Sequence, residues 1–156
     1  MKDYQSLRKH LAQLLIEGEA HITFQDAVKN FPIDKAGLRP GGSPHSAWEL
    51  LEHLRIALED ILQFSTSKEG YVPLKWPDDY WPKSQAPRDD AEWKRSVASV
   101  EKDLAAFLKL VTDPERDLLK PFPWGDGQTL LREAFLVADH NAYHLGQLVL
   151  LRKMIE

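Results

Sequence analysis

The sequence has no cysteine among its 156 residues. Disulfide bridges, thiolate nucleophiles and thiolate metal ligands are therefore excluded, and any thiol chemistry has to come from a second substrate. The sequence also has no excess of positive charge, since its formal net charge is -4. Because binding to a phosphate backbone needs a basic face, we expect no nucleic-acid partner.

Long apolar runs are missing as well. No segment approaches the roughly 20 apolar residues that a membrane-spanning helix requires. The first segment, MKDYQSLRKHLAQLLIEGEAH, interleaves charged and apolar residues instead of forming the apolar core of a signal peptide. We therefore expect a cytoplasmic protein with no membrane partner.

The composition that remains is typical of one folded domain. Hydrophobic residues make up 43% and charged residues 28% of the chain, which is the balance of a globular protein. The length suits a single hydrophobic core. We therefore expect residues 1–156 to form one domain.

Apolar residues recur three and four positions apart in four long segments, the spacing of a buried helix face, and no segment alternates with the period of a strand. Helices are expected over residues 3–17, 46–64, 89–111 and 130–154. Ser46 and Thr129 are the expected N-caps of the second and fourth, and a shorter helix is expected between Thr23 and Pro32. The pattern predicts an all-α protein, a four-helix bundle.

The segment from Ser65 to Arg88 is rich in proline and contains WPDDYWP. Proline deletes backbone donors and fixes φ, so this segment cannot be a regular helix. Connections this long are uncommon in compact domains unless they are functional. The sequence therefore predicts a long ordered crossover that lies across the bundle.

Three histidines fall on predicted inward faces. His140 and His144 are four residues apart on the last helix, so their side chains share one face. His53 occupies the apolar stripe of the second helix. Neutral imidazoles suit divalent transition metals, and three protein ligands leave a coordination position open, as in catalytic sites. The spacing therefore predicts a metal site formed by His53, His140 and His144.

A second interpretation of the same histidines stays open. Inward histidines also occur as hydrogen-bonded core residues, and an isolated HxxxH arises by chance. In that case no metal binds, and replacing the histidines with apolar residues should stabilise the fold.

The motifs WELLEHLR, around His53, and DHNAYHLGQLVLLRK, around His140 and His144, resemble the DinB-like family over nearly the whole chain. The resemblance implies a four-helix bundle with a long crossover loop and one divalent metal, zinc, nickel, manganese or iron, on these three histidines. Characterised relatives include thiol-dependent transferases and isomerases, so it also implies a metal that activates a low-molecular-weight thiol. Gly146 stands where the related sulfoxide synthases carry glutamate, and we do not expect that activity.

Four polar residues flank the histidines on their helix faces. They are candidates to hydrogen-bond the imidazole nitrogens that do not face the metal: Glu49, Asp60, Glu133 and Gln147. A metal-bound imidazole usually donates its other N–H to such a group, although ordinary ion pairs are the alternative.

Trp76, Trp81 and Trp124 are candidates to line a substrate mouth, or else to cover helix ends. We interpret His10, His21 and His45 as surface or capping residues. Asp139 and Tyr143 point away from the ligand face by helix geometry, so they receive no role.

Taken together, the sequence predicts a metal-dependent enzyme of the thiol S-transferase type. A metal-dependent hydrolase remains an alternative, and no general base can be identified. The resemblance also keeps open a non-catalytic metal-binding or stress-response protein. A homodimer is a further expectation, since two-fold pairs dominate oligomers of small proteins.

Overall fold

A computed structural model describes residues 4–66 and 70–156. The described residues form four long helices: α1 (Gln5–Ile16), α3 (Ala47–Thr66), α4 (Asp90–Thr112) and α5 (Leu130–Ile155). Shorter helices are α2 (Phe24–Val28) and the 3-10 turns η1 (Ile33–Lys35), η2 (Pro40–Gly42) and η3 (Asp78–Tyr80). The predicted all-α class is confirmed. The predicted start of the first helix at residue 3 lies outside the described residues.

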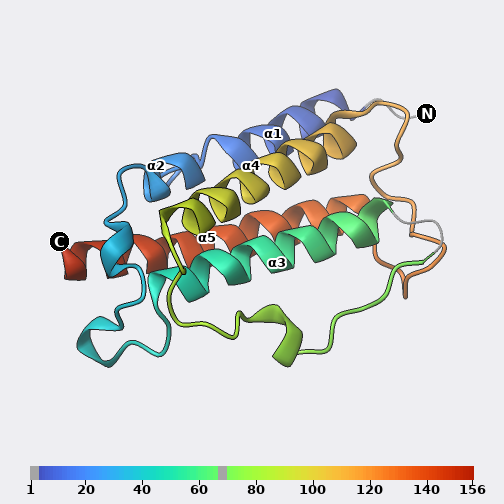
Figure 1. The fold of residues 1–156 in the computed structure, drawn as a ribbon. Coiled ribbons are helices and arrows are strands. Elements are labelled where there is room, and N and C mark those ends of the chain that lie inside the picture. The colour runs from blue at the N-terminus through green and yellow to red at the C-terminus, as the bar shows by residue number, and fades with distance from the viewer. Residues whose placement is uncertain (1–3, 67–69) are drawn as a thin grey trace.

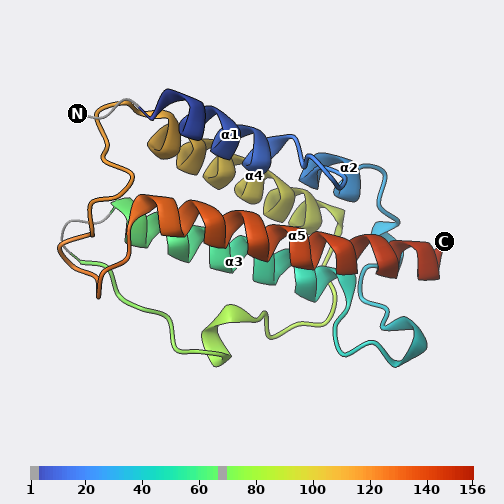
Figure 2. The same cartoon turned by 180° about the vertical axis from the view of Figure 1, so that it is seen from behind.

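The long helices form two layers, α1 with α4 and α3 with α5 (Figures 1 and 2). The partners within each layer run in opposite directions, whereas α3 and α4 run in the same direction. A helix of 20 residues, the length of α3, spans about 30 Å. The connection from α3 to α4 therefore has to return along the bundle, which is why this fold needs a long crossover.

Polar caps fix where the helices begin. Thr129 accepts a hydrogen bond from the Arg132 amide at 3.2 Å, and Ser46 accepts one from the Glu49 amide at 3.2 Å, as expected of these N-caps. At its other end α3 continues to Thr66, two residues past the predicted end. The Ser65 hydroxyl donates to the Ile61 carbonyl within this last turn, a contact that a helix tolerates.

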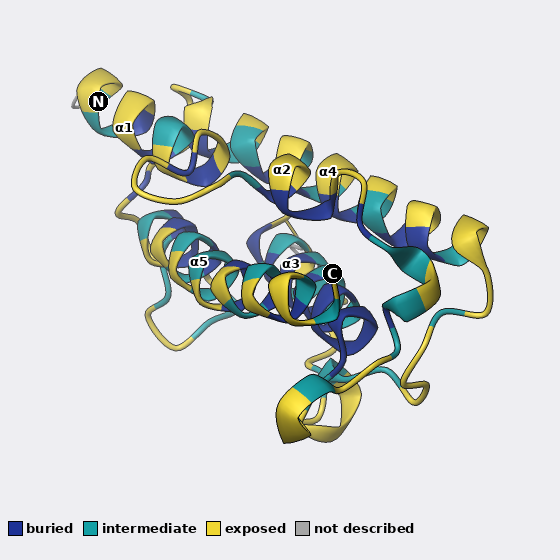
Figure 3. Cartoon of the chain, turned by 90° about the vertical axis from the view of Figure 1, so that its left-hand side faces the viewer, coloured by how far each residue is buried: buried dark blue, intermediate teal, exposed yellow. Residues whose placement is uncertain are grey.

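The core lies between the two layers, and the buried faces of the helices point into it (Figure 3). Leu51, Phe107 and Leu148 are fully buried there. The predicted inward stripes of α3 and α5 are buried, His53 and His144 included, whereas His140 is half-buried. The fold therefore puts imidazoles where the helical periodicity predicts them.

The described part of the crossover lies along α3 (Figure 1), and α3 side chains anchor it. The Trp48 indole N–H donates to the Ser84 hydroxyl at 3.1 Å, and the Ser46 hydroxyl donates to the Gln85 carbonyl at 2.6 Å. Asp60 accepts hydrogen bonds from the hydroxyls of two crossover residues, Tyr71 and Tyr80. These contacts place η3 and Trp81 against the face of α3 that bears His53. Within residues 4–66 and 70–156, no helix combines the length and apolar character needed to cross a membrane.

Candidate metal centre

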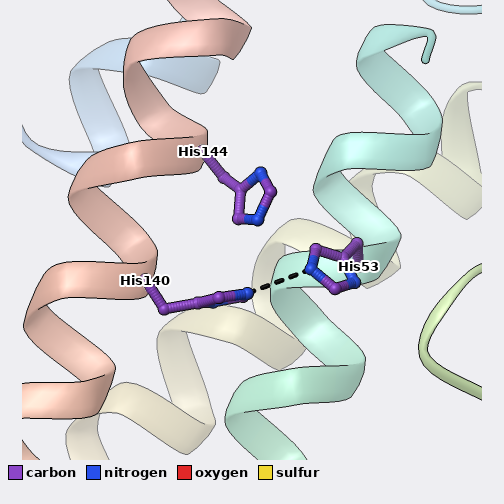
Figure 4. Close-up of side chains that lie close together, drawn as sticks. All are labelled: His53, His140 and His144. Carbon is purple, nitrogen blue, oxygen red and sulfur yellow. Dashed lines mark hydrogen bonds between the residues drawn. The ribbon is translucent and has the colours of Figure 1, made fainter. Parts of the chain in front are cut away.

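His140 and His144, one turn apart on α5, point toward His53 on α3 (Figure 4). The Nε2 atoms of His140 and His53 are 3.0 Å apart. One ring nitrogen from each of the three residues lies within 4.8 Å of the others. The two helices thus bring the three predicted side chains to one point.

The spacing of the His53 and His140 nitrogens fits a shared divalent ion. Imidazole nitrogens about 2.0–2.1 Å from an ion lie about 3.0 Å apart at a right angle and about 3.4 Å apart in a tetrahedron. The 3.0 Å separation of the His53 and His140 nitrogens falls in that range. Since three nitrogens leave a fourth position free in a tetrahedral site, the donor set matches the open arrangement of catalytic metal centres.

The protonation state of the rings also suits a cation. Burial, reinforced by the neighbouring histidines, lowers the pKa of His140 to about 4. Burial is also the main reason that the pKa of His144 is lowered to about 4, and it lowers the pKa of His53. All three rings are therefore neutral near pH 7, with lone pairs available for coordination.

Two contacts behind the rings decide which nitrogens face inward. His53 Nδ1 donates to the Tyr80 carbonyl at 2.7 Å, and because a carbonyl can only accept, the lone pair of His53 is on Nε2. His144 Nδ1 lies 3.1 Å from Gln147 Oε1, which leaves its Nε2 free. Such outer contacts hold metal-binding imidazoles in position. Gln147 was a sequence candidate for this place, whereas the Tyr80 contact uses a backbone atom and has no sequence signal.

The other three residues predicted to orient the imidazoles form their hydrogen bonds with different groups. Glu49 accepts from the Ser46 amide at 2.7 Å and pairs with Arg39, so it caps α3. Asp60 lies two turns beyond His53, about 10 Å along the axis, and Glu133 lies two turns before His140. Among the described residues, hydrogen bonds of the imidazoles to these carboxylates are absent. A shared helix face does not bring such distant side chains into contact.

Glu133 is instead buried beside Arg132, with Nη1 of Arg132 at 2.8 and 3.1 Å from its two carboxylate oxygens. Burial raises the pKa of Glu133, and Arg132 opposes this only in part. A raised pKa in the folded state means that Glu133 contributes stability that is complete below its unfolded pKa of about 4.3. That stability is lost as the pH rises through the folded value.

We therefore expect the melting temperature of Glu133→Gln, relative to the wild type, to increase from pH 5 to pH 8, as followed by circular dichroism. Glu101→Gln, at an exposed position of α4, is the control and should show a constant difference. A constant difference for Glu133→Gln as well would contradict the assignment.

Trp81 covers the candidate centre. Its ring stacks on His53, with centroids 4.0 Å apart and 3° between planes, and also on His45 at 3.9 Å and 11°. Trp76 packs edge to face on Tyr80 at 5.3 Å. Aromatic rings thus shield one side of His53 from water.

The imidazoles open into a cavity of about 540 Å³, a size that suits a small ligand. Besides the three imidazoles, the cavity is lined by Ser43, Pro44, His45, Leu50, Trp76, Trp81, Tyr143, Gln147, Leu150 and Leu151. Large side chains at its rim are exposed, 70% for Trp76 and 65% for Tyr143. The three imidazoles therefore face a space that a small molecule can enter.

Two of the three candidate tryptophans, Trp76 and Trp81, line this cavity. Trp124 does not: it lines a separate cavity with Asp60 and Glu133. Its indole N–H donates to the Phe64 carbonyl at 2.8 Å, near the C-terminal end of α3 and about three turns from His53. Trp124 thus covers a helix end, which was the alternative interpretation of the loop tryptophans.

The cavity residues that the sequence did not predict include the aromatic residues His45 and Tyr143. His45 precedes α3 in a loop, and only the crossover brings Trp81 to it, so no local signal existed. Tyr143 was expected to point away, yet its ring lies 4.8 Å from that of His144. A long side chain 100° around a helix from a ligand still reaches the rim of a cavity, and this is the signal that could have found it.

The fold and the site define a class: a helical bundle in which an HxxxH pair on the last long helix meets a third histidine from α3 at the floor of an open cavity. The family model of the DinB superfamily matches residues 19–148, and the chain belongs to that superfamily. No curated protein and no solved structure matches the chain significantly.

Proposed function

We propose that His53, His140 and His144 bind one divalent transition metal and that the protein is a metal-dependent thiol S-transferase acting with a low-molecular-weight thiol. The observation that carries this proposal is the convergence of three neutral imidazoles from two helices on one side of an open cavity. A structural metal site would be closed by a fourth protein ligand. Among the described residues, no cysteine or carboxylate joins this cluster.

A divalent ion held by these imidazoles would supply the activation, since it would lower the pKa of a bound thiol or water toward neutral pH. The chain's own residues supply the rest. The Tyr80 carbonyl and Gln147 hold two of the rings in orientation, and Trp81 excludes water from one side of His53. The cavity provides room for a thiol and an electrophile side by side.

The transfer itself is a substitution. The thiol sulfur forms a bond to an electrophilic carbon while the bond from that carbon to its leaving group breaks. The leaving group departs with the electron pair, and the thiol proton passes to water. The reaction needs no cysteine of the protein, in agreement with the cysteine-free sequence.

The test combines metal analysis with an assay. Metal content is measured on the protein as expressed, and the metal-loaded chain is then incubated with glutathione, bacillithiol or mycothiol and 1-chloro-2,4-dinitrobenzene. We expect about one divalent ion per chain and thioether formation that His53→Ala loses. His10→Ala, a surface histidine on α1, is the matched control and should keep both.

Other outcomes would select the alternatives. Thiol binding without thioether formation favours a non-catalytic metal-binding protein, and consumption of an electrophile by water alone favours a hydrolase. Absence of any bound metal overturns the proposal, and the histidines are then polar core residues.

A further inference from the structure

The described residues that line the cavity around the imidazoles include no ammonium, guanidinium or carboxylate group, since none of them is lysine, arginine, aspartate or glutamate. Lys75, the chain neighbour of Trp76, is paired with Asp78 at 3.3 Å and points into solvent, with 76% of its side chain exposed. A ligand in this cavity therefore meets imidazole, amide, hydroxyl and apolar groups only.

A remote carboxylate on a ligand would find no lysine or arginine in this lining. Proteins recognise carboxylates with arginine or lysine, whose hydrogen bonds replace the lost water. Moving an ionised group out of water without such a partner is strongly unfavourable. A metal ion can satisfy one donor atom of the ligand, but the remainder of the molecule lies against the cavity wall.

That wall favours apolar and aromatic groups. The rim carries three large exposed side chains, Trp76, Tyr143 and Leu150, with 59% of Leu150 exposed, and they continue inward to Trp81 and Leu151. Flat aromatic rings bury much area and stack on other rings. Because this apolar surface is concave and leads to the imidazoles, its occupant is a small molecule; a second copy of the chain could cover only the rim.

We propose that the site takes an uncharged, partly aromatic small molecule with a single sulfur or oxygen donor for the metal, and that it discriminates against thiols with remote carboxylates. This inference rests on the proposed function, because it names the substrate class of the same site. Of the three thiols in the assay above, it disfavours glutathione and bacillithiol, which carry carboxylates, relative to mycothiol, which carries none.

The test uses two thiols that differ in one charge, phenylmethanethiol and 4-(mercaptomethyl)benzoate. Binding of each to the zinc-loaded full chain is measured by titration calorimetry. We expect the neutral thiol to bind at least about 10-fold more tightly, since the carboxylate of its partner is desolvated without compensation. Equal binding, tighter binding of the anion, or no binding of either thiol would overturn the inference.

Leu150→Lys supplies the missing cation at an exposed position of the rim and should reduce this preference or reverse it. Phe135→Lys is the matched control: it adds the same charge at an exposed position of α5, 50% exposed and outside the cavity lining, and should leave the preference unchanged. Equal effects of both variants would overturn the inference.

Failure of the proposed function is distinguishable: a protein that binds zinc but forms no thioether still allows this comparison of binding, and absence of zinc binding is seen before the thiols are added. The two thiols are in that case compared on the zinc-free chain by quenching of tryptophan fluorescence, and the ratio of their affinities decides the inference by the same criterion.

Discussion

Adding zinc to the metal-free protein is expected to raise its melting temperature by about 5–11 °C. A ligand that binds only the folded state at 100 times its Kd stabilises it by about 2.7 kcal/mol, and each kcal/mol shifts the melting temperature of a chain of this size by about 2–4 °C. The donors meet only in the folded chain, because His53 is 87 residues from His140. Thermal melts with and without zinc measure the shift.

His144→Leu should abolish that shift and weaken metal binding by more than about 100-fold. Loss of a residue that only hydrogen-bonds a metal ligand weakens binding by about 10- to 100-fold, and loss of a ligand itself should exceed that. The position is 7% exposed in an apolar stripe, so the metal-free variant should melt at least as high as the metal-free wild type. His10→Leu should keep the full shift. A metal shift that persists in His144→Leu would show that zinc binds elsewhere.

The second large effect is expected at Tyr80, whose hydroxyl and backbone carbonyl contact two different residues of α3, Asp60 and His53. Tyr80 Oη donates to Asp60 Oδ2 at 2.7 Å, and the carbonyl of the same residue accepts from His53 at 2.7 Å. Burial and Asp60 raise the pKa of Tyr80, so its hydroxyl stays a donor at neutral pH. Asp60 therefore holds in place the residue that orients His53.

Tyr80→Phe should consequently weaken metal binding by about 10-fold, within the range measured for lost outer contacts in metal sites. Tyr71→Phe is the matched control. Tyr71 donates to the other oxygen of Asp60 at 2.9 Å, and burial raises its pKa to about 12, but it makes no contact with His53. Its loss should leave the affinity within about 2-fold of the wild type.

Affinity in this comparison is measured by competition with a chromophoric chelator, and the visible spectrum of the cobalt-loaded protein reports the geometry of the donors. Tyr80→Phe should change the cobalt spectrum, and Tyr71→Phe should not. Equal losses of affinity in both variants would mean that Asp60 stabilises the crossover without orienting His53.

Helical periodicity was enough to predict the fold and the inward histidines. The stripe of α5 repeats apolar residues every three or four positions, and His140 and His144 interrupt it in register, so their burial follows from the packing of that face. The stripe of α3 places His53 in the same way. The observed bounds of α3, α4 and α5 differ from the predicted ones by at most two residues.

The surroundings of the histidines were less predictable, because their contacts come from other segments. A shared helix face suggested Asp60 and Glu133 as outer partners, yet each lies two turns away and is bonded elsewhere. The actual partner of His53 is a backbone carbonyl of η3, and every residue has such a carbonyl. His45 reaches Trp81 only through the fold of two loops.

The sequence by itself determined that the chain is helical, that thiol chemistry of its own is excluded, and that three imidazoles face inward, because these properties depend on composition and on local periodicity. The tertiary structure decided that the imidazoles come together, that the Tyr80 carbonyl contacts His53, and that the described cavity lining contains no lysine, arginine or carboxylate. Those properties depend on how α3, α5 and the crossover pack together, and the interactions that fix this packing join residues far apart in the chain.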